Sequence, residues 1–440
     1  MSTAQDQELS RRHGATSQYT QVLVRTAPAM TPALRACRAT AYDQLFLSHF
    51  IDSFGYLSQK RFCNEAKTTW LEDLPAYIHG PAPGRGNALA MSSIRASAMV
   101  RYGTWTGNAA VTASAHQVYA KALRDLGVLV SSPSAELLTE STVCAAVMLM
   151  HFETDYQTVP GAWIKHVRGA ATLLEAAGPA ACRSGFLHRV FQHLRMQTLL
   201  ASMHENKTPP FSSPEWCSIP FEVYPANAFD RIVEILLSVQ NCLVAVNQLV
   251  EDADDASPDE RKWELRDKLY RIVKQLDKWA QSYMPKRDMK AFRVYDASLH
   301  AHPPPGLSGN YFADSGETNS PVVALASLFH ATSLVTLRLL SACHADRAAD
   351  DAILEHHSCA ILSGLNFARN VSGAVSNFGK IMMLPQLKML SIWGAPSQAR
   401  AYAMKLWAKE SHITSLFADD PESPPGYFAD LAAIILEAAK

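Results

Sequence analysis

The chain has 440 residues, of which 48% are hydrophobic and 18% are charged, and its formal net charge is -1. This composition is typical of a folded globular protein and excludes an intrinsically disordered chain, which would need fewer apolar residues and more net charge. The 40 basic residues are balanced by 41 acidic ones, so the basic excess of a DNA-binding domain is missing.

The eight cysteines are too widely spaced in the sequence to build a compact zinc cluster. The closest two, Cys343 and Cys359, are 16 residues apart. A cluster of two zinc ions and six cysteines needs its thiolates close together, because each zinc–sulfur bond is about 2.3 Å long. The sequence therefore predicts no zinc site, and we expect free thiols in a reducing compartment.

The sequence shows no pattern typical of a secreted or membrane protein. The start, Met1 to Asp6, lacks the apolar core of a signal peptide. The longest uninterrupted apolar run, Val143 to Met150, is shorter than the roughly 20 residues that span a bilayer. We therefore expect an intracellular protein without a membrane partner.

The periodicity of apolar residues predicts helices along nearly the whole chain. Residues 1–32 are polar and mixed, which predicts a loose N-terminal arm. From residue 33 onward apolar residues recur at steps of three and four, as in the run Leu45, Phe46, Phe50, Phe54 and Leu57. Alternating strand patterns are missing from the sequence. We therefore predict one all-α domain over residues 33–440, built as a large multi-helix bundle or array.

Short motifs predict where some of these helices begin and end. Residues 257–260 (Ser-Pro-Asp-Glu) and 320–321 (Ser-Pro) each place a capping hydroxyl before a proline suited to a first helical turn. Residues 178–179 (Gly-Pro) predict the end of the preceding helix. Residues 284–320 predict a long irregular loop, and loops of this length serve as lids, binding loops or disordered links.

The segment 137–179 holds the most informative motifs. An apolar helical pattern ends at residues 152–153 (Phe-Glu), and a short loop leads to residues 163–170, which read Trp-x-x-His-x-x-Gly-Ala. Upstream, residues 118–126 read Val-Tyr-Ala-Lys-Ala-Leu-Arg-Asp-Leu, and residues 214–216 downstream read Pro-Glu-Trp. Together these motifs resemble the fungal-specific transcription factor domain, which is the regulatory middle region of fungal zinc-cluster transcription factors.

This resemblance implies an all-helical regulatory domain. Members of the family usually carry a zinc cluster before the domain, and this sequence has none. The resemblance therefore implies a nuclear protein that regulates a fungal secondary-metabolite gene set without binding nucleic acid directly. It would act through transcriptional partner proteins or an apolar small molecule. Whether it forms a homodimer is left open by the resemblance. The glycine within the helical motif, Gly169, costs about 1 kcal/mol relative to alanine, so we expect two helices to approach closely there.

The alternative is an enzyme of fungal natural-product biosynthesis on the same scaffold. Relatives without the zinc cluster resemble proteins recruited into such pathways, including the non-canonical humulene synthases. An all-helical shell rich in aromatic residues can enclose an apolar pocket. This alternative implies a cytoplasmic, Mg²⁺-dependent sesquiterpene cyclase of the humulene type, which is a lyase, or an isomerase.

Two residues of the family motifs could meet between helices. Glu153 ends one apolar helical pattern and His166 lies in the next. We favour the interpretation that they form a structural polar pair within the core. Under the enzyme alternative they would instead act as a catalytic acid/base pair.

We predict no cofactor for a regulator, but two acidic constellations could hold Mg²⁺ under the cyclase alternative. Their members are Asn247, Glu251 and Asp255 in the first and Asp350, Asp351 and Glu355 in the second. The first set recurs at four-residue steps along one helical face. The second is similar to the aspartate-rich motif of class I terpene cyclases, with a spacing one residue too long. We favour a solvated acidic loop for the first set and acids at a helix N-terminus for the second.

Two lysines, Lys207 and Lys388, are isolated cations near apolar helical patterns. In a cyclase either could bind the diphosphate of the substrate. The simpler interpretation is that their ammonium groups reach solvent while their aliphatic stems cover apolar surface.

Overall fold

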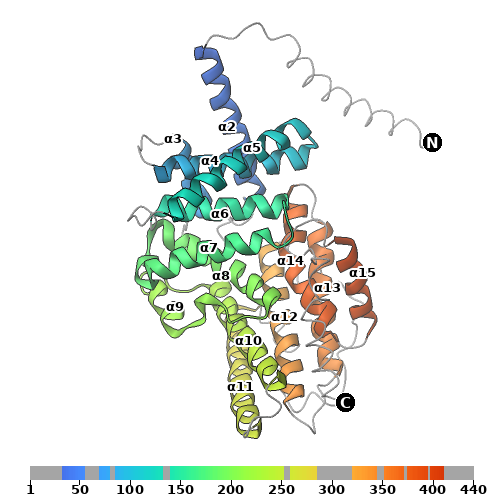
Figure 1. Ribbon diagram of the computed structural model, residues 1–440. Coiled ribbons are helices and arrows are strands. Elements are labelled where there is room, and N and C mark those ends of the chain that lie inside the picture. The colour runs from blue at the N-terminus through green and yellow to red at the C-terminus, as the bar shows by residue number, and fades with distance from the viewer. Residues whose placement is uncertain are drawn as a thin grey trace, which may run out of the picture. The chain divides into compact units, whose positions relative to one another are not determined.

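A computed structural model describes residues 32–54, 69–79, 85–131, 139–251, 258–284, 320–343, 351–370, 374–394 and 397–410. Every regular element in these ranges is helical, so the predicted all-α class is confirmed (Figure 1). The predicted arm lies outside the described residues except for Pro32. The predicted loop at 284–320 lies outside them except for its two end residues.

The contacts divide the chain into two units, Met1–Ser48 and His49–Lys440. The helix α2 (Pro32–Phe54) contains the described part of the first unit and the first residues of the second. Nearly all of the described helices therefore belong to the second unit.

The first part of the second unit is a set of helices packed around α6. Its α-helices are α3 (Leu74–His79), α4 (Arg85–Thr106), α5 (Ala109–Val130), α6 (Glu140–Asp155), α7 (Ala162–Ala177), α8 (Gly185–Glu205) and α9 (Pro214–Ser218). Short 3₁₀ turns lie between them at Trp70–Asp73, Pro179–Arg183, Pro210–Ser212 and Ile219–Phe221. Every residue of α6 from Thr142 to Glu153 is buried. A helix that is apolar on all sides is a core helix, and α4, α7 and α8 pack against it.

The close contact between α4 and α5 explains why position 103 is a glycine. A Cβ atom added at Gly103 would lie 2.9 Å from the backbone nitrogen of Thr112, so only glycine lets the end of α4 meet the start of α5. The close approach predicted at Gly169 is wrong, since a Cβ atom there would meet nothing within 4 Å. Gly169 lies on an exposed face of α7, and helix packing does not account for it.

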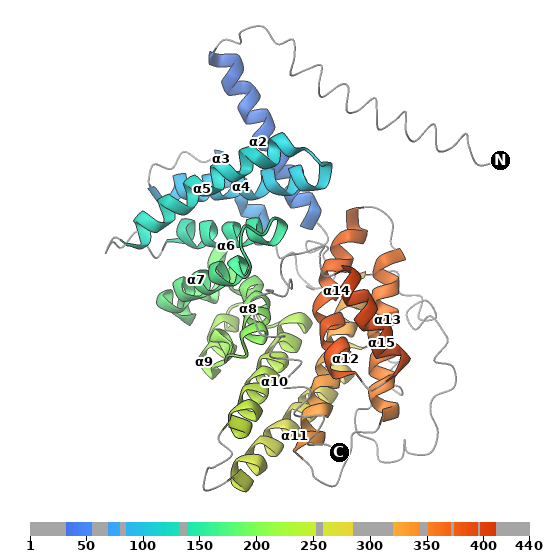
Figure 2. The ribbon, with the colours of Figure 1, turned by 45° about the vertical axis from the view of Figure 1, so that its right-hand side comes forward.

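The second part consists of longer helices stacked side by side. These are α10 (Ala228–Glu251), α11 (Pro258–Tyr283), α12 (Ser320–Ala342), α13 (Asp351–Asn370), α14 (Ala374–Trp393) and α15 (Gln398–Glu410). α12 packs against α10, α11, α13 and α14, and α14 packs against α15 (Figure 2). The motif-based boundaries agree with the structure, because α7 ends before Gly178, α11 begins at Pro258 and α12 begins at Ser320.

Two of these helices are apolar enough to cross a membrane by length and composition alone. They are the segments Ala228–Leu249 of α10 and Val323–Ala342 of α12, with 56% and 89% of their most apolar windows buried inside the protein. Core helices pass the same test, so burial accounts for the composition of α12. Polar residues such as Thr332 and Asn241 interrupt both helices, so neither contains a long continuous apolar run.

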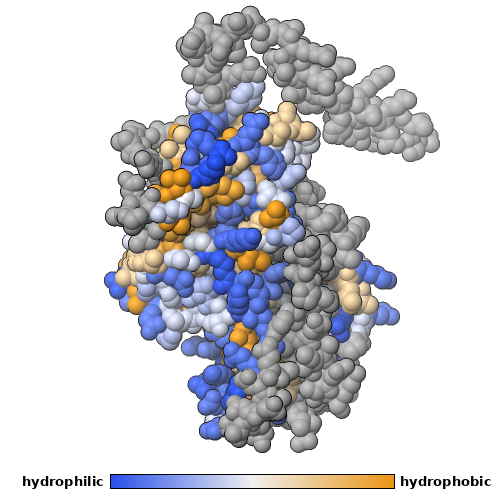
Figure 3. All heavy atoms as spheres, in the orientation of Figure 1, coloured by the Kyte–Doolittle hydropathy of each residue, from blue (hydrophilic) through white to orange (hydrophobic). Residues whose placement is uncertain are grey.

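Large apolar side chains also remain at the surface in several places. Val128 and Val130 are exposed at the end of α5, Trp263 on α11 and Met404 on α15. On the face drawn in Figure 3, hydrophobic residues form separate patches among hydrophilic ones. Scattered exposure of this kind is normal for a folded protein and marks no particular docking face.

Candidate functional site

The residues of three separate sequence motifs meet in one polar cluster. Tyr119 on α5 donates a hydrogen bond to Oε1 of Glu153 on α6, and its hydroxyl lies 3.1 Å from Nε2 of His166 on α7. Thr158, just beyond α6, donates its backbone N–H to Oε2 of Glu153 at 2.8 Å and its hydroxyl to Oε1 at 2.6 Å. Tyr119 therefore links the predicted pair Glu153 and His166, and Glu153 is 0% exposed.

The electrostatics of this cluster indicate a structural role. Burial, followed by the hydrogen bond to Glu153, raises the pKa of Tyr119 far above its ordinary value. Burial also lowers the pKa of His166, and the nearby charge of Glu153 only partly opposes this shift. The phenol and the imidazole are thus neutral at pH 7, while the Glu153 carboxylate accepts three hydrogen bonds. Tyr119 joins the Glu153 carboxylate of α6 to His166 of α7, and a carboxylate held in this way is poorly placed to move a proton.

Removing the Tyr119 hydroxyl tests this role. Tyr119→Phe keeps the ring, which stacks on Phe152 at 3.9 Å, but takes one of three donors from the buried Glu153 carboxylate. We expect the free energy of unfolding to fall by about 1–3 kcal/mol, measured by urea denaturation. Tyr156→Phe is the control, because Tyr156 is 42% exposed, and it should change stability by less than about 0.5 kcal/mol. Equal stability of Tyr119→Phe and the wild type would contradict the assignment.

The structure describes only part of each set of candidate magnesium ligands. Asn247 is half-buried in the last turns of α10, and the side chain of Glu251 and the whole of Asp255 lie outside the described residues. Asp350 lies outside them as well, while Asp351 is exposed in the first turn of α13. Within the described ranges, no three His, Cys, Asp or Glu side chains gather closely enough to hold a metal ion.

Of the second set, Asp351 follows the pattern expected of a helix start. Asp351 opens α13, where a negative charge meets the positive end of the helix dipole. One turn later, Glu355 is half-buried and its Oε1 accepts a contact from Sγ of Cys359 at 3.8 Å. The interpretation that we favoured for the second set therefore holds for Asp351.

The two candidate lysines occupy different environments. Lys207 is exposed and forms an ion pair with Glu205 at 3.3 Å, and Glu205 also accepts a hydrogen bond from Nε of Arg168 at 2.8 Å. A surface ion pair of this kind contributes little to stability or binding. Lys388, in contrast, is half-buried on α14 and lines a hollow between α14 and α8.

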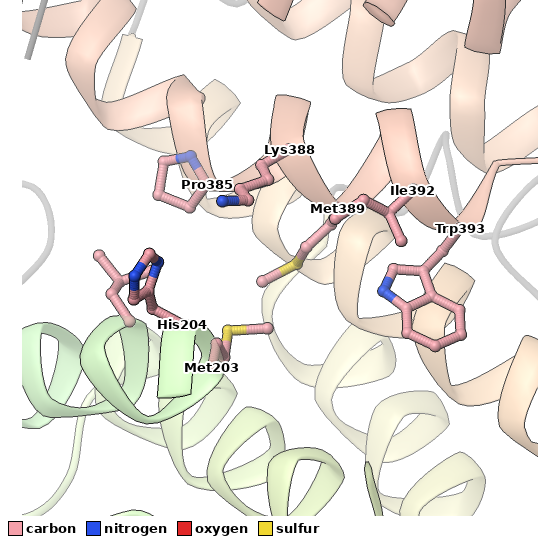
Figure 4. A pocket seen from close by; sticks show the side chains of 8 residues that line it. Met203, His204, Pro385, Lys388, Met389, Ile392 and Trp393 are labelled. Carbon is pink, nitrogen blue, oxygen red and sulfur yellow. The ribbon is translucent and has the colours of Figure 1, made fainter. Parts of the chain in front are cut away.

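This hollow lies between two helices that are far apart in the sequence. Its wall consists of Leu200, Met203, His204, Pro385, Lys388, Met389, Ile392 and Trp393. It measures about 380 Å³ when the open solvent at its mouth is included, and its water-accessible interior is about 30 Å³. In Figure 4, the His204 ring and the Lys388 ammonium lie toward one end, and Ile392 and Trp393 lie at the other.

A proline inside α14 contributes to the shape of the hollow. Pro385 lacks a backbone N–H and cannot donate to the carbonyl of Ile381, so the helix is weakened at the point where it faces α8. Sequence reasoning marked Lys388 only as an isolated cation. The proline three residues earlier was the available signal that this helix departs from regular packing.

The structure also places two histidine clusters in the core, and each brings together side chains from different helices. In the first, Trp70, His151 and His193 form a stack, with ring centroids 5.6 Å apart for Trp70 and His151 and 5.2 Å apart for the two histidines. The Nε2 atoms of both histidines are buried without a hydrogen-bond partner. Burial lowers the pKa of His193 to about 4 and that of His151 well below its ordinary value. Both imidazoles are therefore neutral at pH 7.

The second cluster joins α12 to α13. Nδ1 of His330 lies 2.8 Å from Nδ1 of His357, and the ring of His356 lies 5.8 Å from that of His330. Burial lowers the pKa of His357 to about 3, and the pKa of His330 lies well below its ordinary value for the same reason. A hydrogen bond between two Nδ1 atoms requires one neutral acceptor, which agrees with these shifts.

Comparisons with known proteins give little functional information. The uncharacterized protein AN5342 of Emericella nidulans is 26% identical to the chain over 136 residues. The match spans 31% of this chain and only 29% of that relative. No family model matches the chain, and no solved structure matches it. The chain therefore has a fungal relative, and its function has to be argued from the motifs and the geometry.

Proposed function

We propose that this protein is a fungal transcriptional regulator that does not bind DNA itself and acts through a partner protein or a small apolar ligand. The observation that carries the proposal is the meeting of Tyr119, Glu153 and His166 in one buried cluster. Each of them belongs to a different motif of the resemblance to the fungal-specific transcription factor domain. Motif residues that are far apart in sequence and touch in space fit a shared structural core.

The geometry gives less support to the enzyme alternative. A terpene cyclase needs carboxylates that hold Mg²⁺ beside a cavity that encloses the substrate. The residues that line the hollow between α8 and α14 include no Asp or Glu, and its water-accessible interior of about 30 Å³ is far below the roughly 300 Å³ at which ligand sites begin. Glu153 of the predicted acid/base pair is enclosed by structural hydrogen bonds. These features of the hollow and of Glu153 give no support to a cyclase site.

Gene deletion with complementation tests the proposal in the fungus that encodes the protein. We expect the tagged protein in the nucleus, and we expect deletion to change the transcripts of a clustered set of metabolite genes at least severalfold. Complementation with the wild-type gene should restore them. A cytoplasmic protein with unchanged transcripts after deletion would contradict the proposal.

A parallel test with purified protein addresses the alternative directly. Incubation with farnesyl diphosphate and Mg²⁺ should yield no hydrocarbon product above that of the heat-denatured control. Formation of a humulene-type hydrocarbon would establish the enzyme instead. Tight, sequence-selective binding of promoter DNA by the pure chain would also overturn the proposed mode of action.

A further inference from the structure

Two cysteines on different helices lie at the same height beside α11. Trp279 of α11 donates its indole N–H to the carbonyl of Ala228 on α10 at 2.8 Å, and its ring stacks on that of Phe329 on α12, with centroids 5.4 Å apart. Cys242 follows Ala228 by 14 residues, and Cys343 follows Phe329 by 14. Each interval is about four turns of an α-helix, or about 21 Å. The two cysteines are therefore about equally far from Trp279 along their helices.

The charges around the two thiols place them beside the same two turns of α11. Burial raises the pKa of Cys242 and of Cys343 to about 11, and cations of α11 partly oppose both shifts. Those cations are Lys268 near Cys242, and Arg266 and Lys262 near Cys343. All three precede Trp279 in α11. It follows that α10 and α12 both run antiparallel to α11 and parallel to each other.

The two thiols also lie within reach of each other. α10 packs against α12, and both pack against α11 (Figure 1). Besides burial, a negative charge on Cys343 raises the pKa of Cys242, so the two sulfurs interact electrostatically. The backbone N–H of Cys343 donates to the carbonyl of Leu339 at 3.1 Å, which keeps Cys343 in line with α12.

The spacing of packed helices suits a disulfide at this position. Cα atoms lie about 2.3 Å from a helix axis, and the axes of packed helices are about 8–10 Å apart. Facing Cα atoms are then roughly 3.5–5.5 Å apart, which overlaps the roughly 4.4–6.8 Å that a disulfide spans. Both cysteines are free thiols in this structure. The pair can therefore be bridged by rotation of the two side chains.

We propose that Cys242 and Cys343 form a redox pair, which hydrogen peroxide oxidises to a disulfide that links α10 to the end of α12. Cys343 reacts first, because it is half-buried while Cys242 is 3% exposed. Its thiolate attacks one oxygen of the peroxide, the O–O bond breaks, and the products are a sulfenic acid and water. The sulfur of Cys242 then attacks the sulfenic sulfur, the S–S bond forms, and a second water leaves. Two thiols and one peroxide thus give one disulfide and two waters, and the two electrons lost by the sulfurs reduce the peroxide.

The raised pKa values set the conditions under which the pair reacts. The thiolate is the attacking species, and a thiol with a pKa of about 11 is almost entirely protonated at pH 7. Oxidation is therefore slow at neutral pH, and its rate should rise about tenfold between pH 7 and pH 8. The pair suits sustained oxidation rather than a brief signal, and it stays reduced in a reducing compartment.

Peptide mapping of the oxidised full-length protein tests the proposal. The native protein is incubated with hydrogen peroxide at pH 8, its remaining thiols are alkylated, and it is digested without a reducing agent. We expect a peptide pair joined through Cys242 and Cys343 as the main cross-link, and dithiothreitol should separate it. Failure to form this pair, or a main cross-link between other cysteines, would overturn the proposal.

Serine variants assign the reaction to this pair. Cys343→Ser should abolish the cross-link and leave Cys242 reactive toward the alkylating reagent. Cys359→Ser is the matched control, because Cys359 is half-buried and burial raises its pKa to about 11 as well, but its charged neighbour is Glu355 rather than a thiol. This control should form the cross-link at the wild-type rate. Thermal unfolding of the reduced variants checks that each is folded.

The disulfide should also change the thermal unfolding of the protein. It closes a loop of about 100 residues, which restricts the unfolded chain. We expect oxidation to raise the midpoint of the wild type by about 3 °C or more relative to its effect on Cys343→Ser. An unchanged or lowered midpoint in cross-linked protein would show that the helices have to move apart to form the bond, against the assigned register.

Discussion

Replacement of Arg195 by methionine is expected to lower the free energy of unfolding by about 3–5 kcal/mol, because it leaves a buried carboxylate without its cation. Arg195 on α8 is 1% exposed, and Asp230 in the first turn of α10 is 2% exposed. Nη1 of Arg195 lies 3.8 Å from Oδ1 of Asp230 and donates to its backbone carbonyl at 3.2 Å. This pair is therefore a main link between α8 and α10.

The remaining contacts of Asp230 define how the variant should respond to pH. Gln192 donates to Oδ2 at 2.9 Å, and the backbone N–H of Asn227 donates to the same oxygen at 3.1 Å. Burial raises the pKa of Asp230, and Arg195 opposes that shift. Without Arg195 the folded-state pKa rises further above the unfolded value. In the variant, the folded state is therefore destabilised as the pH rises and Asp230 has to lose its proton. The loss in unfolding free energy should be larger at pH 8 than at pH 5.

Urea denaturation at the two pH values measures this effect. The neighbouring variant Arg231→Met is the control, because Arg231 is half-exposed and pairs with Glu234 at the surface. It should cost less than about 0.5 kcal/mol. The double variant Arg195→Met with Asp230→Asn should recover part of the loss, since the uncompensated charge is gone. A loss below about 1 kcal/mol for Arg195→Met at both pH values would contradict the assigned link.

Acidification is expected to destabilise the protein through its buried histidines, by about 2 kcal/mol each for His193 and His357 between pH 7 and pH 5. The folded-state pKa values are about 4 for His193 and about 3 for His357, against about 6.5 for an unfolded histidine. Between these limits the unfolded chain binds protons that the folded chain does not. The contribution of these neutral histidines to the free energy of unfolding is therefore complete above about pH 6.5 and is lost as the pH falls.

A buried carboxylate changes stability with pH in the opposite direction to the histidines. The test therefore compares variants, so that the contribution of each histidine is isolated. Burial raises the pKa of Asp155 to about 6, although Arg101 lowers it, and protonation of Asp155 favours the folded state as the pH falls. His193→Phe keeps a ring beside Trp70 and removes the titrating group. The difference in unfolding free energy between pH 7 and pH 5 should shrink by about 2 kcal/mol in this variant. His357→Phe should shrink this difference by a similar amount. It should also lower the free energy of unfolding at both pH values, because the hydrogen bond to His330 is lost.

Urea midpoints for the wild type and both variants at pH 5, 6 and 7 measure the effect. The wild type at pH 7 is the reference, because neither histidine is charged there in the folded state. A pH dependence of His193→Phe identical to that of the wild type would show that this imidazole binds a proton as readily in the folded protein as in the unfolded chain, against its assigned burial.

The helical class and several helix ends followed directly from local sequence patterns. Capping motifs such as 178–179 and 257–260 act through hydrogen bonds within one helical turn, and apolar periodicity acts over a few turns. Interactions over such short distances along the chain can be predicted from neighbouring residues alone. The same range explains the error at Gly169, because a glycine inside a helix does not reveal which helix, if any, passes beside it.

Contacts between distant helices were decided only by the tertiary structure. Tyr119 was visible in its motif, but its position between Glu153 and His166 depends on how α5, α6 and α7 are placed. Likewise, Lys207 and Lys388 read alike in the sequence, yet one lies at the surface and the other lines a hollow. The physical reason is that burial and charge pairing depend on helix packing, which involves many side chains far apart in the chain.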